Sequence, residues 1–164
     1  MAITRVEVTP KQGPGMRDVR GDVVRRQLAS DHSISVPEVR SIVGYLVKSE
    51  IDSDSIGSRV NDLFADPIIE DATTNALMLS STTHFTTTPD AIVTVGFKAG
   101  VTDNPGSAAL DGFRTIFPQA TDASISTYIT YAFFGLSGEV DVTWLASTLH
   151  NNLIERALVA DAAA

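Results

Sequence analysis

The chain resembles itself, and this internal repeat constrains the fold more than any other feature of the sequence. Three pairs of segments match in the same order: Arg5–Gly13 with Ile92–Gly100 at a spacing of 87 residues, Asp18–Gly21 with Asp103–Gly106 at 85, and Asp66–Glu70 with Asn151–Glu155 at 85. The change in spacing predicts a short loop insertion in the first copy, within Pro14–Met16. The 164 residues therefore form two copies of about 80 residues each.

Each copy predicts the order strand, helix, strand, an optional further strand, helix, strand. Alternating apolar residues predict the first strand, and apolar residues at i, i+3 and i+4 predict the helices. β-Branched and aromatic residues favour the middle strands. The elements that follow the first strands are helices around 23–28 and 109–117, strands 38–47 and 124–134, helices 56–64 and 142–149, and closing strands 75–79 and 157–160.

This order is that of a ferredoxin-like or split βαβ unit, whose two helices cover one face of an antiparallel sheet. The other face also needs a cover, which the sheet of the sister copy can supply. We therefore expect an α+β fold in which two repeats pack as a pseudo-twofold intramolecular dimer, with antiparallel sheets inside and helices on the outer faces. The expected boundaries are 1–79 for the first repeat, 80–90 for a Ser/Thr-rich linker or an extended edge strand, and 91–164 for the second repeat.

Composition excludes several classes of protein. The chain has no cysteine, which rules out disulfides, thiolate metal sites and a thiol nucleophile. A net charge of -8 and a pI near 4.7 argue against nucleic acid as a partner. No apolar run is long enough to cross a bilayer, and the N-terminus lacks a signal-peptide pattern. We expect a soluble, cytoplasmic protein with no membrane partner.

The repeated motifs resemble those of a known family. Residues Arg5–Gly13, the Asp-x-Arg-Gly motif at 18–21 and the Asp-Pro-Ile-Ile-Glu motif at 66–70 are similar to PurS, the small subunit of phosphoribosylformylglycinamidine synthase. Residues 95–106, Val-Gly-Phe-Lys-Ala-Gly-Val-Thr-Asp-Asn-Pro-Gly, resemble the second PurS-like repeat in the N-terminal region of fused forms of that enzyme. Together the two resemblances cover nearly all of the chain.

The resemblance implies a role in purine biosynthesis, in the ATP- and glutamine-dependent amidation of formylglycinamide ribonucleotide. In that family, PurS-like units are non-catalytic and connect a PurL-type synthetase with a PurQ-type glutaminase. The residues agree with a non-catalytic role. A glutaminase of that kind needs a cysteine and an ATP site needs a glycine-rich phosphate loop, and the chain has neither. We nominate no catalytic residue, cofactor or metal site; His32, His84 and His150 are scattered and lack metal-ligand spacing.

Basic residues supply the candidates for partner contact. Two lysines end the first strands, and an arginine cluster follows on an otherwise acidic chain. Arginine binds carboxylates and phosphates well and is common at interfaces. The alternative interpretation is solvated strand ends and ordinary surface ion pairs. The candidates are the basic residues Lys11, Arg17, Arg20, Arg25, Arg26 and Lys98, together with Asn104 in the second Asp-x-x-Gly motif.

Structural roles are expected at six further positions. The aspartates of the two Asp-x-x-Gly motifs should cap the following helices, and the glycines should permit turns. These residues are Gly13, Asp18, Gly21, Gly100, Asp103 and Gly106. Residues 83–164 carry 3 basic and 8 acidic side chains against 9 and 12 in residues 1–82, so we expect the less charged second half to form more of a protein interface.

Two other functions remain open. Paired βαββαβ units elsewhere bind effectors at their mutual interface, which would make the chain a small-molecule-sensing regulatory domain; this rests on analogy of fold. An enzyme that uses a His/Asp pair is a third hypothesis, for which no residues are nominated. Further self-association is also left open.

Overall fold

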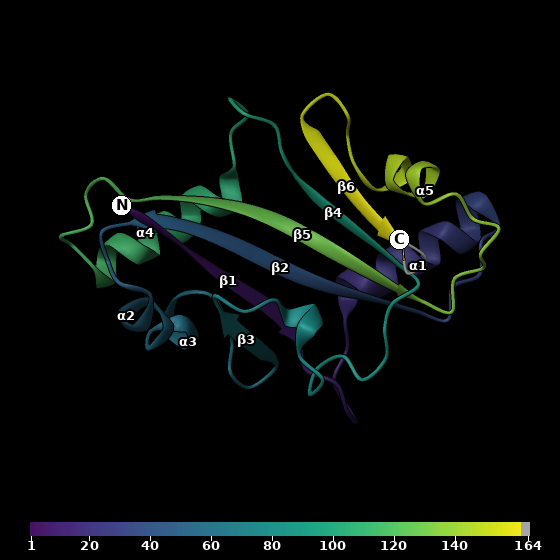
Figure 1. Ribbon diagram of the computed structural model, residues 1–164, viewed down its shortest axis with the longest axis horizontal. Coiled ribbons are helices and arrows are strands. Elements are labelled where there is room, and N and C mark those ends of the chain that lie inside the picture. Colours follow the sequence, from purple (N-terminus) through teal and green to yellow (C-terminus); the bar gives the residue numbers. More distant parts are fainter. Residues whose placement is uncertain (162–164) are drawn as a thin grey trace.

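The computed structural model describes residues 1–161 and has an α+β fold (Figure 1). The first half of the chain, residues 1–79, contains β1 Ala2–Pro10, α1 Val19–His32, β2 Glu38–Ser49, α2 Ser53–Gly57, α3 Val60–Leu63 and β3 Glu70–Thr74. A 3-10 turn that begins at Met78 and ends at Ser80 crosses the end of this half. The second half, residues 91–164, contains β4 Ala91–Phe97, α4 Asn104–Ile116, β5 Ser124–Phe134, α5 Val142–Leu149 and β6 Glu155–Asp161. The closing helix expected over 56–64 is divided into α2 and α3.

All six strands form one antiparallel sheet in the order β3-β1-β2-β5-β4-β6. The prediction of two sheets packed face to face is therefore wrong. The two halves join edge to edge instead, because β2 pairs with β5 along almost their whole length, from Glu38–Phe134 to Lys48–Ser124. This pairing satisfies the backbone groups of two strands that would otherwise be exposed edges. As a result, the α-helices cover only one face of the sheet. We call the opposite face, which carries Glu7, Ile42, Gly44 and Tyr128, the helix-free face.

The closing strand of the first half lies earlier than predicted. We expected it over 75–79, but β3 ends at Thr74. Asn75 has a φ of 56°, which turns the chain away from the sheet. Its backbone amide donates to the Arg5 carbonyl, and its side-chain Oδ1 accepts from the Arg5 amide. The expectation for 157–160 is confirmed, since these residues lie within β6.

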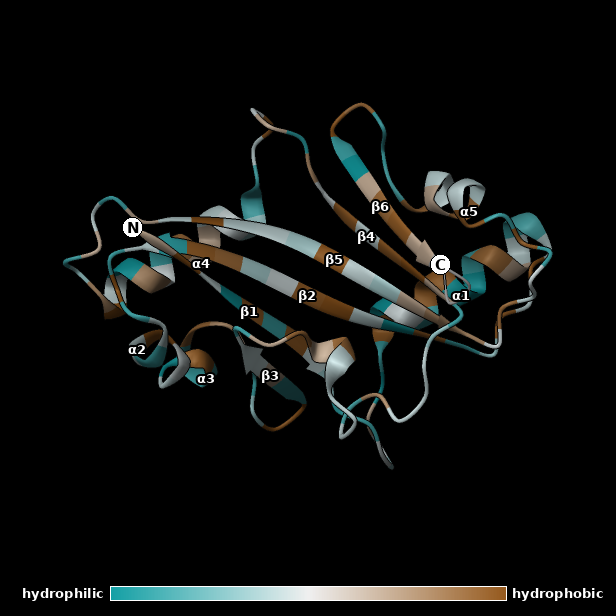
Figure 2. Ribbon diagram, in the orientation of Figure 1, coloured by the Kyte–Doolittle hydropathy of each residue, from teal (hydrophilic) through white to brown (hydrophobic). Residues whose placement is uncertain are grey.

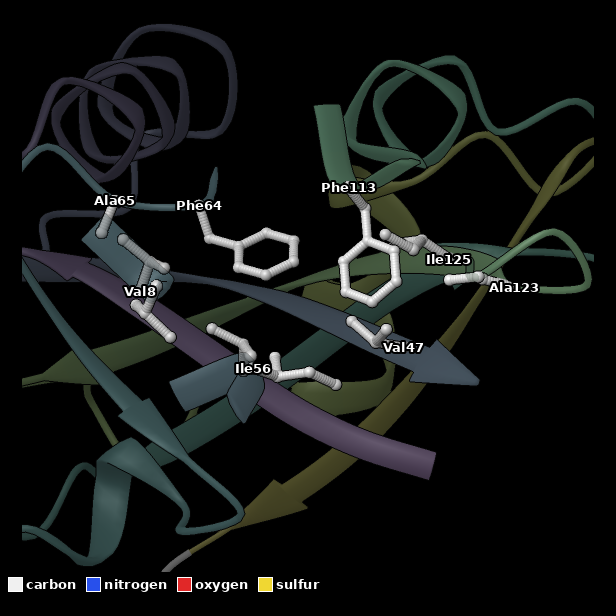
Figure 3. Packing of buried hydrophobic residues seen from close by; sticks show 11 residues of the cluster. Val8, Val47, Ile56, Phe64, Ala65, Phe113, Ala123 and Ile125 are labelled. Atoms are coloured by element: carbon white, nitrogen blue, oxygen red, sulfur yellow. The ribbon is translucent and has the colours of Figure 1, made fainter. Parts of the chain in front are cut away.

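Each long helix packs on a strand of its own half, α1 on β2 and α4 on β5, and also reaches residues of the opposite half. Val24 and Leu28 of α1 belong to one buried cluster with Val93 of β4 and Phe133 of β5. At the other end of the sheet, Phe113 of α4 packs in a second cluster, which joins residues of both halves. Its second-half members include Ala123 and Ile125. Its first-half members include Val8, Val47, Ile56 and Phe64 (Figure 3). The core is therefore shared between the halves.

The strands alternate between the two faces, and Figure 2 shows the resulting bands of high and low hydropathy along β2 and β5. On the helix-free face, the segment after β3 returns across the sheet. Met78 and Phe85 of this segment are buried there against Ile42 and Ala132. Residues 80–90 contain no strand, so the alternative of an extended edge strand is wrong. No helix within residues 1–161 has the length and apolar character that crossing a membrane requires.

Candidate functional site

The two Asp-x-x-Gly motifs form the same clamp between a helix and a strand. Asp18 caps α1 by accepting a hydrogen bond from the Gly21 amide at 2.8 Å, and it also accepts from the amide and hydroxyl of Ser41 in β2 at 2.5 and 2.8 Å. Asp103 caps α4 through the Gly106 amide at 2.7 Å, and it accepts from the amide and hydroxyl of Thr127 in β5. Each carboxylate therefore fixes a helix start to the next strand.

The glycine of each motif lets the helix approach the strand. A Cβ atom at Gly21 would lie 2.0 Å from the carbonyl oxygen of Val39, and one at Gly106 would lie 2.6 Å from that of Ile125. Both distances are shorter than a van der Waals contact allows. The motif is therefore a packing device, with a carboxylate that binds the strand and a glycine that makes room for it.

The Lys-x-Gly motif and the closing motif of each half meet in one corner. The Lys11 amide donates to the Ile69 carbonyl at 2.9 Å, and the Lys98 amide donates to the Ile154 carbonyl at 2.9 Å. Gly13 and Gly100 have φ angles of 134° and 84°, in the left-handed region that favours glycine. Each corner thus ties the end of a half's first strand to the start of its edge strand.

The same corners expose apolar side chains in adjacent pairs. Ile68 and Ile69 are 74% and 50% exposed, and Leu153 and Ile154 are 80% and 40% exposed. Single exposed apolar residues are common on proteins, whereas paired ones beside a lysine are suited to contact with another protein. We call these the Ile68 corner and the Leu153 corner.

The candidate basic residues of the first half gather beside the Ile68 corner. Lys11, Arg17 and Arg25 line a cavity of about 340 Å³, and Arg17 and Arg20 line a neighbouring cavity of about 320 Å³ with Ile69. These side chains are not a free positive patch. Nε of Arg17 lies 2.7 Å from a carboxylate oxygen of Asp22, and Nε of Arg25 lies 3.7 Å from the other; the Arg17 hydrogen bond lowers the pKa of Asp22.

The other candidates lie apart from this group. Arg26 lines neither cavity and donates from Nε to the Asp22 carbonyl at 3.3 Å. Lys98 lines a separate cavity of about 690 Å³ with His150, and its ammonium donates to the Asn152 carbonyl. Asn104 is the exposed first residue of α4. The structure thus gathers the first-half candidates, apart from Arg26, and leaves the second-half ones dispersed.

A buried polar contact on the helix-free face escaped the sequence analysis. Glu7 of β1 is only 4% exposed, and its two carboxylate oxygens accept from the Tyr128 hydroxyl and from the Met78 amide, each at 2.6 Å. Burial, then the hydrogen bond to Glu7, raises the pKa of Tyr128, so the phenol keeps its proton. Glu7 of β1 thereby connects β5 of the second half with the segment that follows β3.

A glycine explains where the Tyr128 ring lies. A Cβ atom at Gly44 would sit 2.0 Å from an atom of that ring, so the ring occupies the place of a side chain at position 44. No short-range pattern links residues 7, 44 and 128. The only signal in the sequence is a glycine within a strand, which often marks a close approach.

A histidine–carboxylate pair also forms on this face. His84 Nδ1 lies 3.3 Å from one oxygen of Asp71, and Lys11 Nζ lies 3.8 Å from the other. The three side chains are 23–35% exposed, which is typical of surface ion pairs. Within residues 1–161, no three acidic or histidine side chains lie close enough to hold a metal ion.

The comparisons with known proteins add no assignment: no protein-family model matches the chain, and no curated protein matches it significantly.

Proposed function

We propose that the chain is a PurS-like, non-catalytic module of phosphoribosylformylglycinamidine synthase, which acts in cytoplasmic purine biosynthesis and connects a PurL-type synthetase with a PurQ-type glutaminase. It is either a tandem subunit or the N-terminal domain of a fused enzyme. In this proposal, residues 1–79 and 91–164 are two PurS-like repeats related by a pseudo-twofold axis, and residues 80–90 join them.

The register of the central strands is the observation that carries the proposal. Val43 of β2 pairs with Ile129 of β5, which lies 86 residues later, between the repeat spacings of 85 and 87. Two copies related by a twofold axis must pair, at that axis, each residue with its own counterpart. The antiparallel pairing of β2 with β5 therefore supports two repeats joined as in a symmetric dimer.

The matching clamps and corners support the same relation. The Asp18 and Asp103 clamps bind equivalent strand residues, and the Lys11 and Lys98 amides bind equivalent carbonyls. The motifs that carry the resemblance to PurS therefore form equivalent contacts in both halves. A bridging module needs a stable scaffold with two contact surfaces, and the Ile68 and Leu153 corners are suited to that role.

Reconstitution tests the proposal. The chain, a PurL-type synthetase and a PurQ-type glutaminase should together give glutamine-dependent amidation, and omission of the chain should abolish it. If the chain binds neither protein in size-exclusion runs at micromolar concentration, the proposal fails.

Single substitutions in the corners locate the contact surfaces. Ile68→Asp and Leu153→Asp change side chains that are 74% and 80% exposed, so the fold should tolerate both. Each should weaken binding to one partner by about tenfold or more if the corner is a hot spot. Ile3→Asp, at an apolar residue that is 63% exposed outside the corners, is the matched control and should leave binding unchanged.

A further inference from the structure

A row of residues in register crosses the helix-free face and leaves a hollow. The row contains Glu7, Gly44, Tyr128, Gly96 and Arg156, one from each of five neighbouring strands. The Tyr128 ring lies over Gly44 and reaches towards Glu7. On its other side Gly96 has no side chain, so a space remains between Tyr128 and Arg156. The hollow above Gly96 is therefore flanked by the aromatic ring of Tyr128 and the guanidinium group of Arg156.

This space is part of a cavity of about 470 Å³ lined by both halves of the chain. Its size falls in the range of small-molecule sites. The surface of the cavity is mostly apolar, and the aliphatic side chains that line it are Ile42, Leu46, Leu77, Leu79, Ile92 and Leu158. Leu77 and Leu79 come from the segment that Glu7 holds through the Met78 amide, so the rim on that side is fixed in place. The cavity is therefore largely apolar, and Glu7 holds one of its rims in position.

The charged groups in the lining favour an anion. Arg5 and Arg156 form no ion pair with any residue between 1 and 161, and Nε of Arg5 is buried without a hydrogen-bond acceptor. Glu7 is the only carboxylate in the lining, and both of its oxygens already accept hydrogen bonds. With two arginines and one carboxylate in its lining, the cavity carries a net positive charge. A carboxylate in the cavity would accept charge-assisted hydrogen bonds from the guanidinium groups of Arg5 and Arg156, which no carboxylate of residues 1–161 engages.

We propose that this cavity binds a small amphipathic carboxylate, with its apolar body over Ile42, Leu46 and Ile92 and its carboxylate between Arg5 and Arg156. A second copy of the chain is a poorer occupant, because the same cavity on that copy offers no free carboxylate to the arginines. The inference rests on the cavity and not on the bridging role, and it gives the small-molecule-sensing alternative a specific site.

Titration calorimetry with dodecanoate, below its micelle concentration, tests the proposal on the full chain. Dodecanoate should bind with one site per chain, and dodecan-1-ol and dodecylammonium should bind at least about tenfold more weakly, because each lacks the charge-assisted hydrogen bonds to arginine. Amide chemical shifts should move at Gly96 and Tyr128. Equal binding of the alcohol, or shifts confined to other residues, would overturn the proposal.

Substitutions separate this site from non-specific apolar binding. Arg5→Gln and Arg156→Gln should each lower the affinity about tenfold, while Arg59→Gln, which removes an arginine paired with Asp62 outside the cavity, should leave it unchanged. Gly96→Val should abolish binding by filling the hollow. A Cβ at position 96 meets only ordinary contacts, at 3.7 Å, so the backbone leaves room for it.

Sedimentation of the chain and of Gly96→Val checks the alternative occupant. A monomer in both cases supports the proposal. A dimer that Gly96→Val dissociates would overturn it, because a second copy would then fill the cavity. Since these readouts do not involve the synthetase or the glutaminase, their failure is distinguishable from failure of the bridging role.

Discussion

The two halves of the chain share their scaffold and differ on the helix-free face. Asp18 and Asp103 form the same clamp, and Tyr45 and Tyr131, 86 residues apart, both have a pKa raised mainly by burial. By contrast, the counterpart of Tyr128, 86 residues earlier, is Ile42. The contacts found in both halves, such as the two clamps, stabilise the fold. The Glu7–Tyr128 contact is found in one place only and makes that part of the helix-free face chemically different from the rest.

Cutting the chain should have the largest effect on this comparison. A break after Thr86 leaves α1 without Val93 and Phe133, and leaves Phe113 without Val47 and Phe64. Each fragment keeps the strand under its long helix but loses the other half's share of the core. Each alone should therefore lack cooperative unfolding, and an equimolar mixture should regain it. Near-ultraviolet circular dichroism during urea unfolding measures this. A cooperative transition in the isolated fragment 1–86 would contradict the shared core.

The glycines of the two clamps should differ in their sensitivity to substitution. Gly21→Ala places a Cβ 2.0 Å from a carbonyl oxygen and should lower the free energy of unfolding by about 3 kcal/mol or more. Gly106→Ala, at 2.6 Å, should cost less, about 1–3 kcal/mol. Gly112→Ala is the control within α4, where a Cβ meets nothing within 4 Å, and it should stabilise by up to about 1 kcal/mol. Equal losses at 21 and 106 would contradict this ranking.

Removing the single-copy contact should cost somewhat less. Glu7→Ala leaves the Tyr128 hydroxyl and the Met78 amide without their acceptor, which should lower the free energy of unfolding by about 2 kcal/mol. Thr94 lies on the same face 87 residues later and serves as the control; its hydroxyl contacts only that of Thr130, so Thr94→Val should cost about 1 kcal/mol. Chemical denaturation measures both, and equal losses would show that Glu7 has no special role.

Alkaline pH should reveal the buried tyrosines. A folded-state pKa above the unfolded value of about 10 means that the unfolded chain loses the proton first. The stabilisation is therefore complete below pH about 10 and is lost as the pH rises through the folded pKa of each phenol. Absorbance at 295 nm should show less tyrosinate at pH 10 in the folded protein than in the protein in guanidinium. Half-titration at pH 10 in the folded state would contradict the burial of these rings.

The smallest effect is expected at Asp22, which has no acidic counterpart in the second half. Asp22 follows Gly21, whereas Ser107 follows the equivalent glycine, Gly106. Arg17 lowers the pKa of Asp22, so the carboxylate stabilises the fold above its unfolded pKa near 4 and this contribution is lost as the pH falls through the lower folded value. Because the pair is at the surface, Asp22→Asn should cost at most about 0.5 kcal/mol at pH 7, and nothing at pH 2. Thermal unfolding at both pH values measures the difference.

The sequence predicted the elements whose signal is local. The strand over 124–134 follows from its β-branched and aromatic residues, and the helix starts follow from the capping aspartates. The closing strand was misplaced, because a left-handed Asn75 ends it and that conformation depends on Arg5 in a distant strand. The single sheet could not be inferred, since a repeat does not specify whether its copies meet by edge or by face. The Glu7–Tyr128 contact spans 121 residues, which no local pattern indicates.

The covalent link between the halves has a consequence for how this surface can change. In a dimer of two identical chains, every substitution appears on both sides of the axis, so a bulky ring and the glycine that accommodates it would both occur twice. In this chain Tyr128 meets Gly44, while the counterparts of these residues are Ile42 and Thr130. A single mutation can therefore alter one side of the seam without a matching clash on the other. Each half is free to acquire its own ligand or partner while the other keeps the scaffold.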